Sequence, residues 1–136
     1  FRTRGVEAVG VSIDSQYTHW AWRNTPTDQG GIGAVKFPLV ADKSHSITRD
    51  YGVENAEGVA FRASFLIDRD GIVQHQVVNN LPLGRNVDEM LRLVDALQHH
   101  EEYGEVCPAG WQKGDSAMKE NAESVANYLS SNATKL

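Results

Sequence analysis

Sulfur is scarce in this sequence, which has 136 residues, one cysteine and two methionines. The single cysteine, Cys107, cannot form a disulfide within the chain, so a secreted fold held together by disulfides is excluded. A reducing compartment, the cytoplasm, is therefore expected. Cys107 is either inert, singly reactive, or the partner of a cysteine on another chain.

The sequence also lacks an excess of basic residues and any long apolar run. It has 13 Lys and Arg against 18 Asp and Glu, a formal net charge of −5, which argues against a nucleic-acid-binding surface. No stretch reaches the roughly 18 apolar residues that span a membrane, and no signal peptide is recognisable. We therefore expect neither a nucleic-acid nor a membrane partner.

The order of the remaining patterns predicts an α/β domain with a mixed sheet. Strands are expected at 6–14, buried on both faces, and at 37–42, followed by an antiparallel hairpin, 62–67 and 72–79, across the turn at 68–71. Helices are expected at 16–24, 44–51, 87–100 and about 122–129. The opening FRTRG is typical of a helix end with a glycine stop, so we expect the chain to begin within a fold.

Two helix starts carry capping residues. Asp14 or Ser15 is predicted to cap the helix at 16–24. Asn86 is predicted to cap the helix at 87–100, with Glu89 returning the capping bond. An apolar stripe along this second helix predicts the face that packs: Val87, Met90, Leu91, Val94 and Leu97.

Cys107 lies in a segment whose composition indicates a loop. Its neighbours Glu105, Pro108 and Gly110 are typical of an accessible, extended tail; the alternative is a buried cysteine acting as a small apolar residue. Nearby Glu101, Glu102 and Glu105 should raise the pKa of the thiol. Cys107 is thus better suited to attack an already oxidised sulfur than to react first.

Three other patterns bear on chemistry. Arg62 and Arg85 stand at the starts of a strand and a helix, where they could stabilise a thiolate and a polarised oxygen–oxygen bond; surface ion pairs are the alternative. His99 and His100 are adjacent and point in divergent directions, so a solvated helix end is favoured over a metal site. The GGIG at 30–33 follows no strand and opens no helix, which excludes a phosphate-binding loop.

Several segments together resemble one known family. They are GVSIDSQYTHWAW, FPLVAD, FRASFLIDRDGIVQH, NNLPLGRNVDEMLRLVDALQ and GEVCPAGWQKG. In this order they closely resemble the typical two-cysteine peroxiredoxins, the alkyl hydroperoxide reductase and thiol-specific antioxidant family. The resemblance implies a thioredoxin-like fold and covers the chain from about residue 5 to its end.

The resemblance also implies a function. Members of the family reduce hydrogen peroxide and organic hydroperoxides without a metal or cofactor. A peroxidatic cysteine becomes sulfenic acid, and a resolving cysteine from an identical partner subunit condenses with it; thioredoxin or a flavoprotein reductase then reduces the disulfide. Cys107 matches the resolving cysteine, Arg62 the active-site arginine and Arg85 a supporting arginine. The strand at 72–79 matches the edge through which family dimers join, and some members form decamers.

The family's peroxidatic motif does not occur in these 136 residues. We therefore expect a thioredoxin-like domain at 1–100 that lacks its central strand and peroxidatic helix, and a tail at 101–136 that carries Cys107. On this expectation the chain alone neither reduces peroxide nor folds stably. The alternatives are a non-catalytic, chaperone-like binding module and a thioredoxin-fold adaptor with a vestigial thiol.

Overall fold

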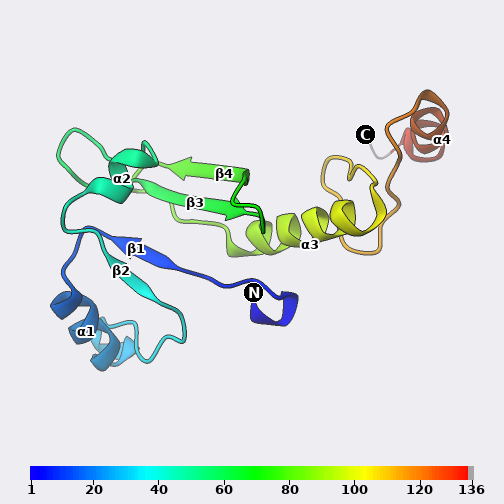
Figure 1. The fold of residues 1–136 in the computed structure, drawn as a ribbon. Helices are drawn as coiled ribbons and strands as arrows, with labels where there is room; N and C mark the ends of the chain where they lie inside the picture. Colours follow the sequence, from blue (N-terminus) through cyan, green and yellow to red (C-terminus); the bar gives the residue numbers. More distant parts are fainter. Residues whose placement is uncertain (135–136) are drawn as a thin grey trace. The chain divides into compact units, whose positions relative to one another are not determined.

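The computed structural model describes residues 1–134, so the last two residues of the expected tail lie outside it. The elements (Figure 1) are, in chain order, η1 (Arg2–Arg4), β1 (Gly10–Ser12), α1 (Gln16–Asn24), η2 (Thr27–Gln29), β2 (Leu39–Ala41), α2 (Ser46–Asp50), β3 (Arg62–Ile67), β4 (Val73–Asn79), α3 (Val87–Tyr103) and α4 (Ala122–Asn132). The predicted alternation of strands and helices is confirmed. No helix within residues 1–134 combines the length and apolarity that crossing a bilayer demands.

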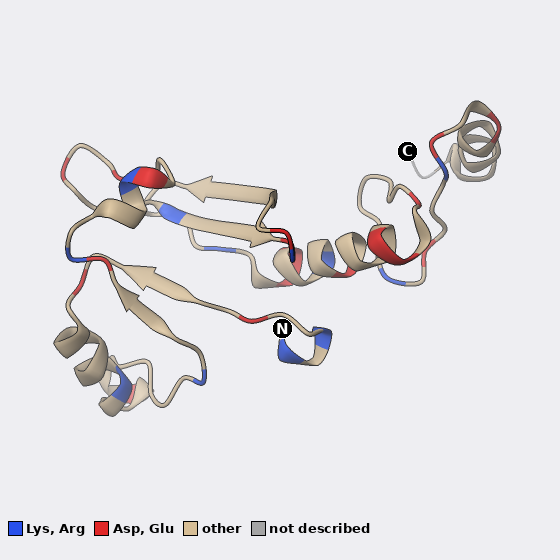
Figure 2. Ribbon diagram, in the orientation of Figure 1, with Lys and Arg blue, Asp and Glu red and all other residues tan. Residues whose placement is uncertain are grey.

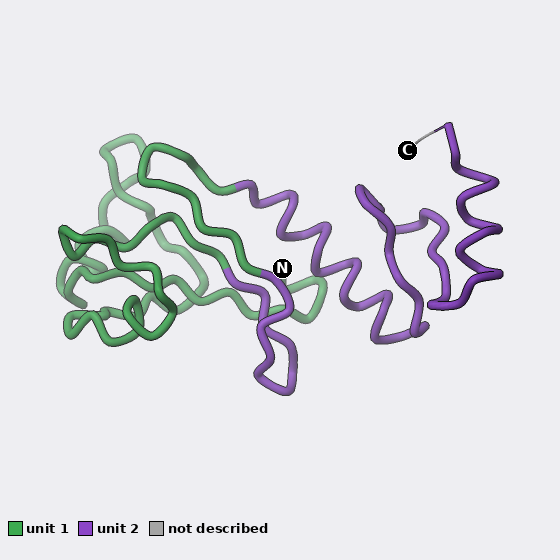
Figure 3. The backbone as a smooth tube through the Cα atoms, turned by 90° about the horizontal axis from the view of Figure 1, so that it is seen from above, with its two compact units in different colours: residues 1–64, 76–85 green, residues 65–75, 86–136 purple. Residues whose placement is uncertain are grey.

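The chain divides into two compact units, coloured separately in Figure 3. Residues 1–64 and 76–85 form the first unit, and residues 65–75 and 86–134 form the second. The four strands of the described chain make two separate two-stranded sheets, β1 with β2 and β3 with β4. The expected mixture of parallel and antiparallel pairing is present, in two sheets.

β1 and β2 are parallel, with Gly10 opposite Leu39 and Ser12 opposite Ala41. The strand predicted at 6–14 is shorter than expected, and the prediction that it is buried on both faces is wrong. Val9 and Val11 are 56% and 43% exposed. Within the described residues β1 bonds to one neighbouring strand only, so this two-stranded sheet leaves part of the apolar surface of the segment exposed.

α1 begins as predicted, because the Ser15 hydroxyl accepts a hydrogen bond from the backbone N–H of Thr18 at 3.2 Å. Two aromatic side chains of α1 face solvent: Tyr17 is 76% and Trp20 69% exposed. The buried side chain of α1 is His19, whose Nε2 lies 2.6 Å from the Ser12 hydroxyl. The buried residue of α1 therefore makes a polar contact with β1.

The GGIG segment folds back on the C-terminal end of α1. The N–H of Ile32 donates to the Trp22 carbonyl at 3.0 Å, and that of Gly33 donates to the Thr25 carbonyl at 3.3 Å. A Cβ atom at Gly31 would overlap the Thr25 carbonyl. The glycine is thus required by close backbone approach, and the segment completes hydrogen bonds that the helix end leaves open.

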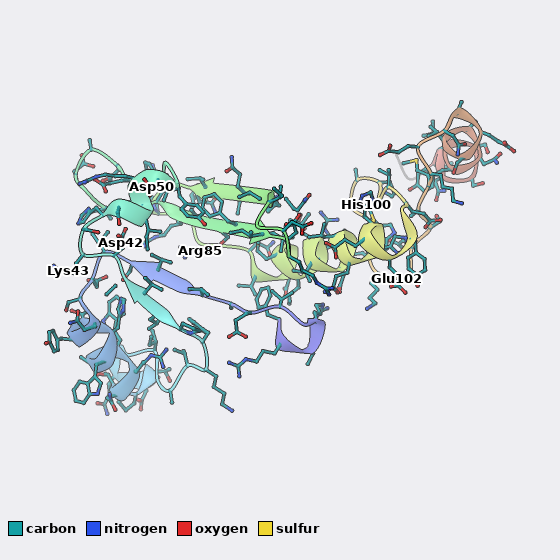
Figure 4. All side chains as sticks on the ribbon, in the orientation of Figure 1. Asp42, Lys43, Asp50, Arg85, His100 and Glu102 are labelled. Carbon is teal, nitrogen blue, oxygen red and sulfur yellow. The ribbon has the colours of Figure 1, made fainter. Side chains whose placement is uncertain are left out.

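α2 is capped from a distance by a buried carboxylate. One oxygen of Asp42 accepts from the N–H of Ile47 at 3.2 Å, and the other accepts from the N–H and hydroxyl of Thr48 at 2.9 and 3.1 Å. Burial raises the pKa of Asp42, but these hydrogen bonds and the charge of His45 outweigh burial, and the pKa lies below its ordinary value. Figure 4 labels Asp42 beside α2.

β3 and β4 form the predicted hairpin, with arrows running in opposite directions in Figure 1. The Asp68 carboxylate accepts the backbone N–H groups of Asp70 and Ile72, both at 2.9 Å. It also accepts from the Gln74 side chain at 2.7 Å. The turn is therefore built around one aspartate, as the DRDG sequence indicates.

α3 is longer than predicted and ends at Tyr103, where Gly104 adopts a left-handed conformation. Asn86 caps it as expected, accepting from the N–H of Glu89 at 3.0 Å. The return bond predicted for the Glu89 side chain is wrong, since both carboxylate oxygens bind Arg92 instead. Of the apolar stripe, Val94 is 2% exposed, whereas Val87 in the first turn is 55% exposed.

After Gly104 the chain turns back along α3. Val106 pairs with Met118 through two backbone hydrogen bonds of 2.7 and 3.1 Å, and Trp111 is 2% exposed. Asn121 then caps α4. The segment expected to be an extended tail therefore has a packed centre of its own.

Candidate functional site

Cys107 lies on the segment that folds back after Gly104. Its side chain is half-buried, and the thiol donates a long hydrogen bond of 3.7 Å to the Ala96 carbonyl of α3. Burial raises the pKa of the thiol; Arg92 lowers it and Glu105 raises it, and the balance lies above the ordinary value. The predicted direction is confirmed, but the main cause is burial, because the segment is packed and not fully extended.

One face of α3 holds this segment. Arg92, Ala96 and His99 are spaced four and three residues apart, so they lie along the same side of the helix, and His100 follows His99 directly. Each contacts the segment from Glu105 to Trp111. The segment is thus held on α3 both before Cys107, at Glu105, and after it, at Trp111.

His99 is more than part of a solvated helix end. Its Nε2 lies 2.9 Å from a Glu105 carboxylate oxygen, and its ring lies 4.7 Å from the Tyr103 ring and 4.9 Å from the Trp111 ring. His100 Nδ1 lies 2.9 Å from the Glu105 carbonyl oxygen. The expectation that both histidines are mainly solvated is therefore wrong for His99. Both histidines contact Glu105, His99 through the carboxylate and His100 through the carbonyl oxygen.

Charge is concentrated around this segment. Acidic residues lie on the C-terminal turns of α3, where Figure 2 colours the ribbon red and Figure 4 labels Glu102. A hydrogen bond from Tyr103 to Glu102, together with the charge of that carboxylate, raises the pKa of the phenol. Arg92 provides the positive charge that acts on the Cys107 thiol. The surroundings of Cys107 are thus mixed in sign, with burial dominant.

Arg62 and Arg85 lie together in the first unit. Arg62 Nε donates to the Leu81 carbonyl at 3.3 Å, and Arg85 Nε donates at 2.9 Å to the carbonyl of Ala63, the residue that follows Arg62. Both residues are exposed. Both bonds use Nε, so the terminal nitrogens of each guanidinium are the groups that could bind an oxygen or a thiolate. Cys107 belongs to the second unit.

Arg92 and Glu89 were not predicted from the sequence as neighbours of the thiol segment. Their spacing of three residues is a visible signal for a pair on one helix face, but it does not say that another segment folds against that face. Within residues 1–134, no three or more His, Cys, Asp and Glu side chains are arranged to hold a metal ion.

Two family profiles match this sequence: the AhpC/TSA family over residues 1–76, and the C-terminal domain of 1-Cys peroxiredoxin over residues 96–131. The first match covers more than half of the chain. The chain belongs to the AhpC/TSA family. It is 58% identical over 136 residues to an alkyl hydroperoxide reductase C of Helicobacter pylori, covering all of this chain and 69% of that protein.

Other proteins similar to this AhpC/TSA chain are named as peroxiredoxins. Peroxiredoxin-2 of Rattus norvegicus is 50% identical over 131 residues, which are 96% of this chain and 66% of that one. The crystal structure of reduced 2-Cys peroxiredoxin from Plasmodium vivax superposes with a TM-score of 0.93 at 56% identity, covering 96% of this chain and 67% of that chain.

These relatives confirm the predicted family, the thioredoxin-like α/β fold and the class of activity, a thiol-dependent peroxidase. The alternative of a non-catalytic binding module is not favoured, since the similar proteins carry the names of enzymes and the similarity extends over the whole chain.

Proposed function

We propose that Cys107 is the resolving thiol of this peroxidase. The observation that carries the proposal is its setting: a half-buried thiol with a raised pKa, on a segment held by side-chain contacts to α3. A thiol of this kind is mostly protonated near neutral pH, so it is a weak first nucleophile. It is suited to attack a sulfur that is already oxidised and therefore a good electrophile.

In the proposed cycle a peroxidatic thiolate attacks the peroxide, whose O–O bond breaks to give a sulfenic acid and water or an alcohol. Cys107 then attacks the sulfenic sulfur; an S–S bond forms, and the S–O bond breaks to release water. A dithiol reductant, thioredoxin or a flavoprotein reductase system, exchanges with the disulfide and restores both thiols. Because these 136 residues contain one cysteine, the peroxidatic thiol must be supplied from outside them.

Arg62 and Arg85 are proposed to act on the first step. Arg85 donates to the backbone beside Arg62, an arrangement that places two permanent positive charges in one unit. Guanidinium groups there would stabilise the peroxidatic thiolate and the charge that develops on the leaving oxygen. Arg62 is the group expected to contact the reacting atoms, with Arg85 in support.

The proposed partner for the disulfide is an identical subunit of the protein as its cells produce it, which would carry the peroxidatic thiol outside these 136 residues. β4 bonds to β3 as its one strand neighbour in the described chain, and it carries exposed apolar residues, Val73 and Val78. An edge strand of this composition is suited to pairing with a second copy. The edge therefore supports a dimer of identical subunits, from which a larger ring could be built. The proposed location of this assembly is the cytoplasm.

The test is to treat the protein, in the form its cells produce, briefly with hydrogen peroxide and to separate it on a non-reducing gel. Mass spectrometry should find the peptide containing Cys107 joined by a disulfide to a second cysteine, on another chain. Cys107→Ser should abolish the linked species and thioredoxin-dependent turnover, whereas Ala109→Ser, an exposed change two residues away, should preserve both. Unchanged turnover in Cys107→Ser would exclude the resolving role.

A further inference from the structure

We propose that Arg92 is a positioning residue for Cys107: anchored by Glu89, it holds the segment of the thiol on α3 and places a positive charge beside it. The proposal deepens, and rests on, the resolving role proposed for Cys107. The contacts that carry it all lie within the second unit.

Arg92 is held rigidly at its own position. Its Nε and Nη2 donate to the two carboxylate oxygens of Glu89 at 2.6 and 2.7 Å. A bidentate pair of this kind fixes the plane of the guanidinium. The pairing raises the pKa of Arg92 and lowers that of Glu89, each mainly through these hydrogen bonds. The guanidinium is thus a fixed and permanent charge.

The third donor of Arg92 reaches the segment. Nη1 donates to the Trp111 carbonyl at 3.0 Å. The Trp111 ring is buried, its indole N–H donates to the Asp115 carbonyl at 3.0 Å, and its backbone N–H donates to the Pro108 carbonyl at 3.1 Å. Pro108 follows Cys107 directly. Arg92 therefore ties the thiol to α3 through two hydrogen bonds on its C-terminal side.

The same residue acts on the thiol through its charge. Burial and the Glu105 carboxylate raise the pKa of Cys107, and Arg92 is the group that opposes them. Replacement of Arg92 by a neutral residue removes that opposition and releases the segment at once. The loss of charge raises the pH at which the thiolate forms. The release makes the sulfur more accessible and relieves part of its burial, which lowers that pH, so a variant that keeps the charge is needed to tell the two effects apart.

One experiment separates the two effects. The rate of Cys107 alkylation by iodoacetamide is measured by mass spectrometry as a function of pH in the full protein, without peroxide. The midpoint of the profile reports the ease of thiolate formation. The plateau at high pH reports access to the sulfur.

Arg92→Met should raise the plateau severalfold, and its midpoint should lie above that of Arg92→Lys, because both variants release the segment and only Arg92→Met loses the charge. Arg92→Lys keeps the charge but removes the planar fork of donors, so its plateau should also rise while its midpoint stays below that of Arg92→Met. Arg69→Met, an exposed arginine at the hairpin turn of the same unit, should change neither. Circular dichroism checks that each variant is folded, and Arg92→Lys keeps the test valid if Arg92→Met does not fold.

An unchanged midpoint and plateau in Arg92→Met would overturn the proposal, as would an equal shift in Arg69→Met. The test is independent of the peroxidase cycle because no peroxide is present. If the profile moves as expected but Cys107→Ser retains full thioredoxin-dependent turnover, the positioning stands and the resolving role falls.

Discussion

Replacement of Trp111 by alanine should release the segment that carries Cys107 from α3. The Trp111 ring is 2% exposed and lies 4.9 Å from the His99 ring, and its indole N–H donates to the Asp115 carbonyl. Truncation of a buried tryptophan costs about 3–5 kcal/mol. Because the ring packs between this segment and α3, the cost should fall on the opening of the segment.

A destabilisation of about 3 kcal/mol corresponds to roughly a hundredfold rise in the open population, since about 1.4 kcal/mol is a factor of ten. Amide hydrogen exchange of residues 105–119, followed by mass spectrometry, measures this population directly. The exchange of these amides should therefore accelerate by about two orders of magnitude, up to the limit set by the stability of the segment itself.

Two further variants make the test specific. Trp111→Phe keeps a ring beside His99 and removes the indole hydrogen bond, which costs about 1 kcal/mol, so exchange should accelerate about fivefold. Trp20→Ala removes an indole that is 69% exposed and should leave residues 105–119 unaffected. If Trp111→Ala exchanged no faster than Trp20→Ala, the view that Trp111 fastens the segment would be refuted.

Three other predictions concern stability. Gly31→Ala places a Cβ against the Thr25 carbonyl and should cost about 1–3 kcal/mol of unfolding free energy in urea titration, whereas Gly84→Ala, with open space around it, should cost little; equal effects would contradict the close approach. In thermal unfolding, Val94→Ala should lower the unfolding free energy by about 2 kcal/mol. Val87→Ala, on the exposed first turn of the same helix, should lower it by under about 0.5 kcal/mol. A reversed order would mean that the buried face of α3 is wrongly assigned. Hydrogen bonds hold the folded-state pKa of Asp42 below its unfolded value. The stabilisation by its carboxylate is therefore complete at neutral pH and is lost as the pH falls from about 5 through the folded pKa. Asp42→Asn should flatten this part of the stability–pH curve, and an unchanged slope would show that Asp42 does not titrate in this way.

Much of the fold was predictable because local signals and structure agree. Ser15 and Asn86 cap helices as their positions indicate, since a side-chain oxygen before a helix satisfies N–H groups that no other residue can reach. The DRDG turn and its flanking strands are also local, because hairpin pairing involves residues close in sequence. Family membership followed from motifs read in order along the whole chain.

Burial was harder to predict. The two tryptophans Trp20 and Trp111 have the same side chain, yet one is exposed and the other is buried. Composition around Cys107 indicated an accessible tail, whereas the chain turns at Gly104 and packs on α3. Such packing depends on segments brought together by the turn, which no pattern within either segment encodes.

The sequence alone determined the helices, the hairpin, the family and the residue that carries the sulfur, because each depends on neighbours a few positions away or on motifs read in order. The tertiary structure alone decided that Glu89 binds Arg92 instead of the backbone, and that Arg92 and His99 fasten the segment of Cys107. A charged side chain takes the strongest partner within reach. Which partners are within reach becomes known only when the chain has folded back on α3.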